Sequence, residues 1–209
     1  FPETTGLRID QVVSMWFAAC QVTHRSERQV EEQIFARVAG LIRQQQPLMP
    51  GVREALTLCH SLGLKIGLAS ASPLSLIEMV LELFSIRHFF SVVVSAEDLP
   101  YSKPHPQVYL NAASELNVNP LHCVALEDSL NGMVAAKAAR MRVLVVPAAS
   151  EAALPVWSLA TARLDSLIDL TPALLGVPTQ PYSSGGKIAL PAASHFLSEI
   201  TIVTASHIL

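Results

Sequence analysis

The sequence predicts an α/β fold: a doubly wound parallel sheet, preceded by part of a helical cap. Between residues 65 and 147, short apolar runs alternate with amphipathic segments of helical period, and turn-forming residues separate them. Short and wholly apolar runs are typical of strands that are buried on both faces, as in parallel sheets. Alternation of such strands with helices places helices on both faces of one sheet.

Residues 1–47 predict helices without a strand. Apolar residues three and four positions apart indicate an amphipathic helix over residues 8–20, with one apolar face. A second amphipathic helix follows from Val30 to Ile42 and ends before Pro47. We interpret residues 1–47 as a partial helical cap, separate from the α/β core.

Residues 48–176 predict the core. Its expected helices cover residues 51–62, 73–84, 106–116 and 131–139, and its expected strands cover residues 65–70, 91–95, 123–126 and 142–147. Gly63 marks the end of the first of these helices, and Pro73 and Pro106 open the next two, because proline is tolerated in a first helical turn.

The last part of the chain carries a weaker pattern. Residues 162–176 could hold a short edge strand and a closing helix that ends at Gly176. Residues 177–209 are turn-rich at first and have no clean period afterwards. We expect this tail to be poorly ordered or loosely docked.

Composition excludes several classes of protein. The chain has 209 residues, is 51% hydrophobic and 15% charged, and has a net charge of −3, which gives no reason to expect nucleic acid or a membrane surface as a partner. No apolar run approaches the length of a membrane span. Its three cysteines, Cys20, Cys59 and Cys123, form no CxxC motif, so we expect free thiols in a cytoplasmic protein. We expect a monomer.

Polar residues follow three of the predicted strands. Ser70 ends the first, Lys103 follows the second, and Glu127 and Asp128 end the third. Carboxyl ends of parallel strands are where open α/β sheets bind ligands. Two adjacent carboxylates repel each other unless a cation such as Mg²⁺ lies between them. Prolines on both sides of His105 restrict the backbone next to Lys103, which favours capture of an anion.

Together, a hydroxyl, a restrained cation and paired carboxylates predict a phosphate site with Mg²⁺. Taken one at a time, these residues have simpler explanations. Ser70 could be a helix cap, Lys103 a solvated charge, and Glu127 with Asp128 a solvated acidic pair.

Five segments extend the pattern beyond single residues: GLRID, LMPGVREAL, GLASASP, LPYSKPHPQVYL and CVALEDSLNGMVAAKAARM. They resemble the haloacid dehalogenase superfamily of phosphohydrolases, and the resemblance covers about residues 6–176. The resemblance is to the branch with a helical cap near the N-terminus, which includes sugar-phosphate phosphatases and β-phosphoglucomutase. Within that branch, the segments look closest to bacterial phosphatases of hexitol phosphates and of 2-deoxyglucose 6-phosphate.

The resemblance implies a role for each polar residue. Ser70 would hydrogen-bond the transferring phosphoryl group, and Ala71 would add a backbone contact. Lys103 would neutralise the phosphate and the charged intermediate. Asp128 would be a Mg²⁺ ligand, assisted by Glu127 directly or through water.

Two further residues match positions near the substrate in relatives. Asn131 would make a polar contact that orients the site. Arg8 would reach the distal phosphate or hydroxyl groups of the substrate, with an exposed arginine at the start of a helix as the alternative.

One family motif is missing. The first motif, DxDx[TV], supplies the aspartate nucleophile and the acid/base, and none of the five aspartates lies two residues from another (Asp10, Asp98, Asp128, Asp165 and Asp169). We expect the missing part, with the central strand and the first cap helix, to precede Phe1. The sheet would then have a gap between the strands at 65–70 and 123–126, and the chain would be a fragment.

The resemblance therefore implies a Mg²⁺-dependent phosphatase of small sugar or sugar-alcohol phosphates, which acts through an aspartyl-phosphate in the full-length family. Without the nucleophile, we expect these 209 residues to have no phosphatase activity. A sugar phosphomutase similar to β-phosphoglucomutase would share every motif above. A non-catalytic fragment that binds phosphate ligands is the third alternative.

Overall fold

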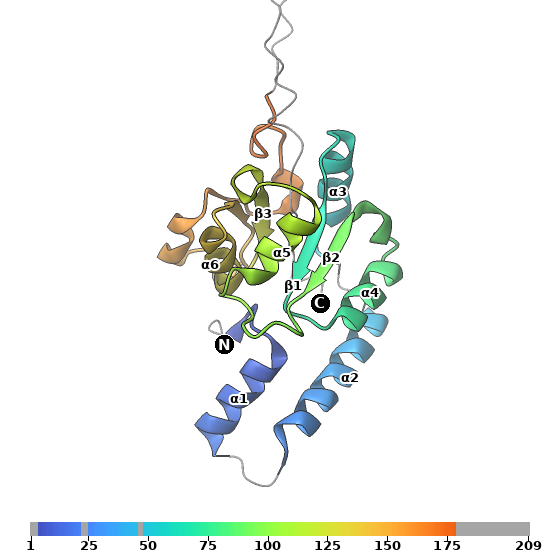
Figure 1. Ribbon diagram of the computed structural model, residues 1–209, viewed down its shortest axis with the longest axis vertical. Coiled ribbons are helices and arrows are strands. Elements are labelled where there is room, and N and C mark those ends of the chain that lie inside the picture. The colour runs from blue at the N-terminus through green and yellow to red at the C-terminus, as the bar shows by residue number, and fades with distance from the viewer. Residues whose placement is uncertain (1–3, 22–24, 46–47, 179–209) are drawn as a thin grey trace, which may run out of the picture.

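The computed structural model describes residues 4–21, 25–45 and 48–178 (Figure 1). Its helices and strands follow in the order α1 (Ile9–Cys20), α2 (Glu27–Gln45), α3 (Val52–Ser61), β1 (Gly67–Ser70), α4 (Leu74–Leu83), β2 (Val92–Ser95), α5 (Gln107–Glu115), β3 (Val124–Glu127), α6 (Leu130–Ala138), β4 (Arg142–Val145) and β5 (Ala162–Arg163). Short 3-10 helices lie at Arg87–Phe89, Pro120–His122, Pro155–Leu159 and Leu167–Asp169. The predicted α/β fold is confirmed. Almost all of the tail 177–209 lies outside the described residues.

One predicted element is wrong. The edge strand within residues 162–176 is present as β5, but a 3-10 turn at Leu167–Asp169 and a run of turns replace the closing α-helix. Pro172 restricts the residue before it and cannot donate a backbone hydrogen bond. Leu167, Leu170 and Leu175 still bury their side chains, so this stretch covers the core without forming an α-helix.

The strands form two separate parallel sheets within the described residues. In one, β1 pairs with β2, with Gly67 opposite Val92. In the other, β4 lies between β3 and β5 and pairs with both. Figure 1 shows β3, β1 and β2 in this order across the molecule. No described strand pairs with β1 on the side away from β2, or with β3 on the side away from β4.

Two apolar clusters show that both sheets lie in one layer. On one face, Leu68 of β1 packs in the same cluster as Leu126 of β3, under α3 and α4. On the other face, Ala69 of β1 shares a cluster with Ala125 of β3, under α5 and α6. Because side chains alternate between the faces of a strand, clusters shared on both faces indicate that the two sheets are parts of one layer.

The helices α1 and α2 form a hairpin beyond the carboxyl ends of the strands (Figure 1). The predicted helix at 8–20 is confirmed, but its apolar face is buried only at Val12 and Val13. Trp16 is 42% exposed, and Cys20 is exposed. The apolar face that the periodicity predicts is therefore only partly covered within the described residues.

None of the helices in the described ranges combines the length and the apolar character that a membrane crossing requires.

Candidate functional site

The structure places the predicted polar residues at the carboxyl ends of the strands. Ser70 is the last residue of β1, and Glu127 is the last residue of β3, with Asp128 directly after it. Lys103 comes from the loop between β2 and α5. All four side chains are buried. This burial is incompatible with the alternatives of a solvated acidic pair and a solvated lysine, which were therefore wrong.

Lys103 and Glu127 form an ion pair. The lysine Nζ atom lies 2.6 Å from Glu127 Oε1, and both side chains are fully excluded from solvent. Nζ also lies 5.0 Å from the centre of the Tyr109 ring. A buried ion pair is stable only when further hydrogen bonds satisfy its members. The surroundings of Glu127 supply them.

The carboxylate of Glu127 accepts hydrogen bonds at both oxygens. Oε1 accepts from Lys103 Nζ and from the Tyr109 hydroxyl. Oε2 accepts from Ser129 Oγ at 3.1 Å and from the Asp128 backbone N–H at 3.2 Å. The expected assistance of Glu127 to a metal stays a prediction. In this structure the Glu127 carboxylate holds Lys103 in place.

A glycine makes room for this carboxylate. A Cβ atom built on Gly132, in the first turn of α6, would lie 2.0 Å from the carboxyl carbon of Glu127. Such a distance is far inside van der Waals contact, so any side chain at position 132 displaces the Glu127 carboxylate. A glycine is needed here because the long Glu127 side chain folds back over the first turn of α6.

Tyr109 and Ser129 are site residues to which sequence analysis gave no role. Tyr109 lies on the buried face of α5, and nothing in the neighbouring sequence signals its contact with Glu127. Burial raises the pKa of the Tyr109 phenol well above its ordinary value, and the Glu127 carboxylate adds to the effect. Ser129 is the N-cap of α6 and accepts from Gly132 N–H. Serine is favoured at helix N-caps, so Ser129, directly before the helix, could have been predicted as a cap from the sequence.

Asp128 lies in the right chemical setting for a metal ligand. Its side chain is buried, at 4% exposure, at the carboxyl end of β3. The described residues contain no cluster of three or more histidine, cysteine, aspartate or glutamate side chains that could hold a metal ion. Mg²⁺ commonly binds one or two carboxylates and takes its other ligands from water and phosphate oxygens. The oxygen donors here fit such a partial Mg²⁺ site.

Ser70 closes the turn that leads from β1 to α4. Its Oγ accepts a hydrogen bond from Ser72 N–H at 3.1 Å. The residue at the N-cap of α4 is Pro73, without a side-chain cap. The helix-cap alternative for Ser70 is therefore wrong. Ala71 follows within the same tight turn and is buried.

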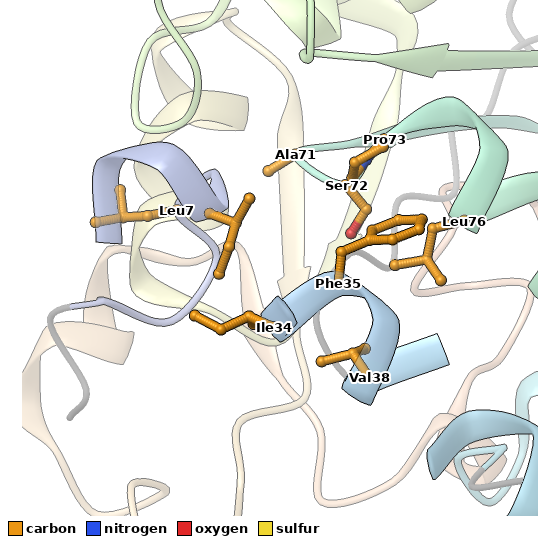
Figure 2. A pocket seen from close by; sticks show the side chains of 9 residues that line it. Leu7, Ile34, Phe35, Val38, Ala71, Ser72, Pro73 and Leu76 are labelled. Atoms are coloured by element: carbon orange, nitrogen blue, oxygen red, sulfur yellow. The ribbon is translucent and has the colours of Figure 1, made fainter. Parts of the chain in front are cut away.

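A cavity of about 160 Å³ lies between this turn and the helical hairpin. Figure 2 shows side chains of α2 facing the turn after β1 across it. The residues that line it are Leu7, Ile9, Ile34, Phe35, Val38, Ala71, Ser72, Pro73 and Leu76. Ser72 carries the only polar side-chain group in this set, so the cavity offers mainly apolar contact.

Arg8 anchors α1 to the loop after β2. Its guanidinium donates to both carboxylate oxygens of Asp10, at 2.7 and 2.8 Å, and to the carbonyl oxygens of Ala96 and Leu99, at 2.7 Å each. The hydrogen bond from Arg8 lowers the pKa of Asp10, and the same bond raises the pKa of Arg8. The alternative of an exposed arginine is wrong, since the side chain is only 15% exposed. Substrate contact by Arg8 stays a prediction.

Asn131 ties the N-terminal segment to α6. Its Nδ2 donates to Thr5 O at 2.8 Å. Next to it, Gly6 has a φ of +82°, and a Cβ there would lie 2.4 Å from Ser129 Oγ. Residues 4–6 therefore lie against the first turn of α6. The predicted contact of Asn131 with substrate stays a prediction.

Comparisons with known proteins show what this chain is similar to. The family model of haloacid dehalogenase-like hydrolases matches residues 10–140. Hexitol phosphatase B of Escherichia coli strain K12 is 54% identical over 170 residues, which cover 81% of this chain and 77% of that protein. The solved structure of CbbY from Rhodobacter sphaeroides in complex with phosphate covers 81% of this chain and 78% of its own, with a TM-score of 0.72 and 25% identity. A β-phosphoglucomutase from Clostridium difficile has the same fold, with a TM-score of 0.72, 24% identity, and coverage of 84% of this chain and 78% of its own.

Proposed function

Since this chain belongs to the haloacid dehalogenase-like hydrolases and is a phosphoric monoester hydrolase by that relationship, we propose that its site serves a Mg²⁺-dependent phosphatase of small sugar or sugar-alcohol phosphates. The substrate class follows the similarity to hexitol phosphatase B. The observation that carries the proposal is the set of buried polar groups at the strand ends, Ser70, Lys103 and Asp128.

Each group has a part in this proposal. The Ser70 hydroxyl and the backbone of Ala71 hydrogen-bond the phosphoryl oxygens. Lys103, which Glu127 and Tyr109 hold in one position, offsets negative charge on the phosphoryl group. Asp128 would hold Mg²⁺, with Glu127 assisting through water, and the bound ion would neutralise further charge. Arg8 and Asn131 complete the proposed set on the cap side and at α6.

We propose that these 209 residues do not carry out the covalent step. An aspartyl-phosphate requires an aspartate nucleophile, with an acid/base two residues on, and no two aspartates of the 209 residues have that spacing. On this proposal, the 209 residues bind Mg²⁺ and phosphate but do not hydrolyse phosphate esters.

Binding and turnover can be measured on the same purified chain. Titration calorimetry with inorganic phosphate should show binding that strengthens when Mg²⁺ is added, and Asp128→Asn should remove that strengthening. Asp165→Asn, at an exposed carboxylate 3.6 Å from Arg163, is the matched control and should leave it unchanged. Absence of phosphate binding would refute the site. Metal-dependent release of phosphate from a hexitol phosphate or 2-deoxyglucose 6-phosphate would refute the inactivity.

A phosphomutase is the second candidate, because β-phosphoglucomutase has the same fold. A mutase must hold a sugar bisphosphate with either phosphate at the Lys103 site, so it needs a second cation for the distal phosphate. Arg8 is the proposed cation on that side, and it already bonds Asp10 and the loop carbonyls. We expect a sugar bisphosphate to bind no more tightly than the monophosphate; tighter binding by tenfold or more would favour the mutase.

The proposal also includes a cytoplasmic monomer. Three free cysteines, of which Cys59 and Cys123 are buried, support the cytoplasmic location. Light scattering of the purified chain tests the oligomeric state.

A further inference from the structure

Two polar residues are the only buried ones in the loop after β2. Of residues 97–105, Ser102 is 2% exposed and Lys103 is 0% exposed, while all the others are half-buried or exposed. Loops normally keep polar side chains in water, because a polar group that leaves water needs a new partner. Lys103 has its partner in Glu127. Ser102 lies directly before it, and its burial needs a separate explanation.

The Ser102 hydroxyl has no hydrogen-bond partner in the described part of the chain. A buried hydroxyl without a partner destabilises the folded protein, because it gives up its hydrogen bonds to water. This cost falls on the ligand-free protein and is removed when a ligand supplies the missing hydrogen bond. Since buried polar groups nearly always have partners, the hydroxyl indicates a group that binds from outside the chain.

The local sequence explains why the loop itself does not satisfy this hydroxyl. Serine hydroxyls commonly accept from backbone N–H groups two or three positions further along the chain. Two positions after Ser102 is Pro104, which has no backbone N–H. Three positions after it, the N–H of His105 donates to the Ser102 carbonyl oxygen at 3.0 Å. The usual local donors are therefore absent or already used.

Ser102 lies beside the residues of the proposed phosphate site. It precedes Lys103, whose Nζ atom is held 2.6 Å from Glu127 Oε1 at the carboxyl ends of the strands. Its loop also begins beside the serine of that site, because Ala96 N–H donates to Ser70 O at 2.8 Å. A hydroxyl in the residue next to a buried lysine suits an oxyanion, since it can donate a hydrogen bond to an anionic oxygen.

We propose that Ser102 Oγ donates a hydrogen bond to a phosphate oxygen of the substrate, in addition to the contacts of Ser70 and Lys103. The inference rests on the proposed function, since its ligand is the phosphate group of that site. In this role the hydroxyl raises affinity for phosphate and lowers the stability of the ligand-free protein.

The variant Ser102→Ala separates a ligand contact from a structural contact, because the two roles predict opposite changes in stability. Removal of an unpartnered buried hydroxyl should raise the melting temperature of the ligand-free chain by at least about 2 °C. Titration calorimetry with inorganic phosphate and Mg²⁺ should show binding weakened by about tenfold or more, since alanine offers no donor. Higher stability together with weaker binding is the expected result.

Two other serine-to-alanine variants are matched controls. Ser95 Oγ donates to Ser72 O at 2.7 Å and accepts from Glu97 N–H at 3.0 Å, so Ser95→Ala should lower the melting temperature. Ser114 is exposed on α5, so Ser114→Ala should leave the affinity for phosphate unchanged.

Every other result for Ser102→Ala overturns the inference. Unchanged affinity for phosphate would mean that the hydroxyl does not contact the ligand, even in a more stable variant. A lower melting temperature, or a variant that does not fold, would indicate a structural partner such as a buried water. If the wild-type chain binds no phosphate, the proposed function fails and this inference fails with it. Wild-type binding that is unchanged in Ser102→Ala refutes this inference alone and leaves the proposed function standing.

Discussion

Lys103 and Glu127 connect the two sheets through a buried ion pair, with 2.6 Å between Nζ and Oε1. Lys103 follows the sheet of β1 and β2, and Glu127 ends the outer strand of the other sheet. The pair therefore joins two parts of the strand layer that share no described backbone ladder. Its position also fixes the ammonium group at the carboxyl ends of the strands.

Removing one member of this pair should be strongly destabilising. Glu127→Gln leaves the Lys103 charge buried without its counter-charge, which costs about 3–5 kcal/mol in comparable sites. Urea unfolding of the purified chain measures this loss.

The double variant Lys103→Met, Glu127→Gln is the control for this first prediction. Since it removes both charges, it should be clearly more stable than Glu127→Gln alone. Equal unfolding midpoints of the single and double variants would contradict an ion pair that compensates two buried charges.

Gly132→Ala should destabilise the protein through the same carboxylate. Its Cβ would lie 2.0 Å from the carboxyl carbon of Glu127, so Glu127 must shift and its hydrogen bonds weaken. We expect a loss of about 1–3 kcal/mol in free energy of unfolding. Gly40→Ala in α2 is the matched control, with no atom within 4 Å of the added Cβ, and it should stabilise by up to about 1 kcal/mol. A Gly132→Ala variant as stable as Gly40→Ala would contradict the packing.

Asp10 should make stability depend on pH in the acid range. The hydrogen bond from Arg8 lowers the pKa of Asp10 below its ordinary value of 3.8. A carboxylate with a lowered folded-state pKa stabilises the protein above its unfolded pKa, and the contribution is lost as pH falls through the folded-state value. Asp10→Asn should therefore lower stability at pH 7 and flatten the decline of stability below pH 3.8.

The size of this effect is limited because Asp10 is 41% exposed, so solvent screening keeps it below about 1 kcal/mol. Thermal melts from pH 7 to pH 2 measure it. Asp165→Asn, at an 84% exposed carboxylate, should leave the profile unchanged. Parallel profiles of Asp10→Asn and the wild type would argue against the Arg8 contact.

The cysteines should differ in reactivity toward a thiol reagent. Burial raises the pKa of the Cys59 thiol to about 12, so at pH 8 the reactive thiolate is a minor fraction, of order one in ten thousand. Cys20 is exposed and should react with the reagent as soon as the two are mixed. Cys59 and Cys123 should react only after unfolding in urea. Fast reaction of more than one thiol in the native protein would contradict this burial.

Much of the fold could be predicted because the evidence for it is local. The apolar runs that end at Ser70 and before Glu127 are short and bounded by turn residues, which suffices for strands β1 and β3. The prediction of a closing helix after residue 162 was wrong, since three buried leucines with near-helical spacing fit a 3-10 turn and loops equally well. The periodicity of α1 predicted the helix but not the exposure of Trp16, which depends on what packs against it.

By itself, the sequence determined the order of the helices and strands up to β4, because periodicity and turn residues act over a few positions. It also determined that Ser70, Glu127 and Asp128 lie at strand ends and Lys103 in the loop after β2. Only the tertiary structure decided what these side chains contact. It turned Glu127 toward Lys103, Tyr109 and Ser129 and made Gly132 necessary beside it. These are contacts between segments far apart in the chain, and spacing along a sequence carries no information about such distances.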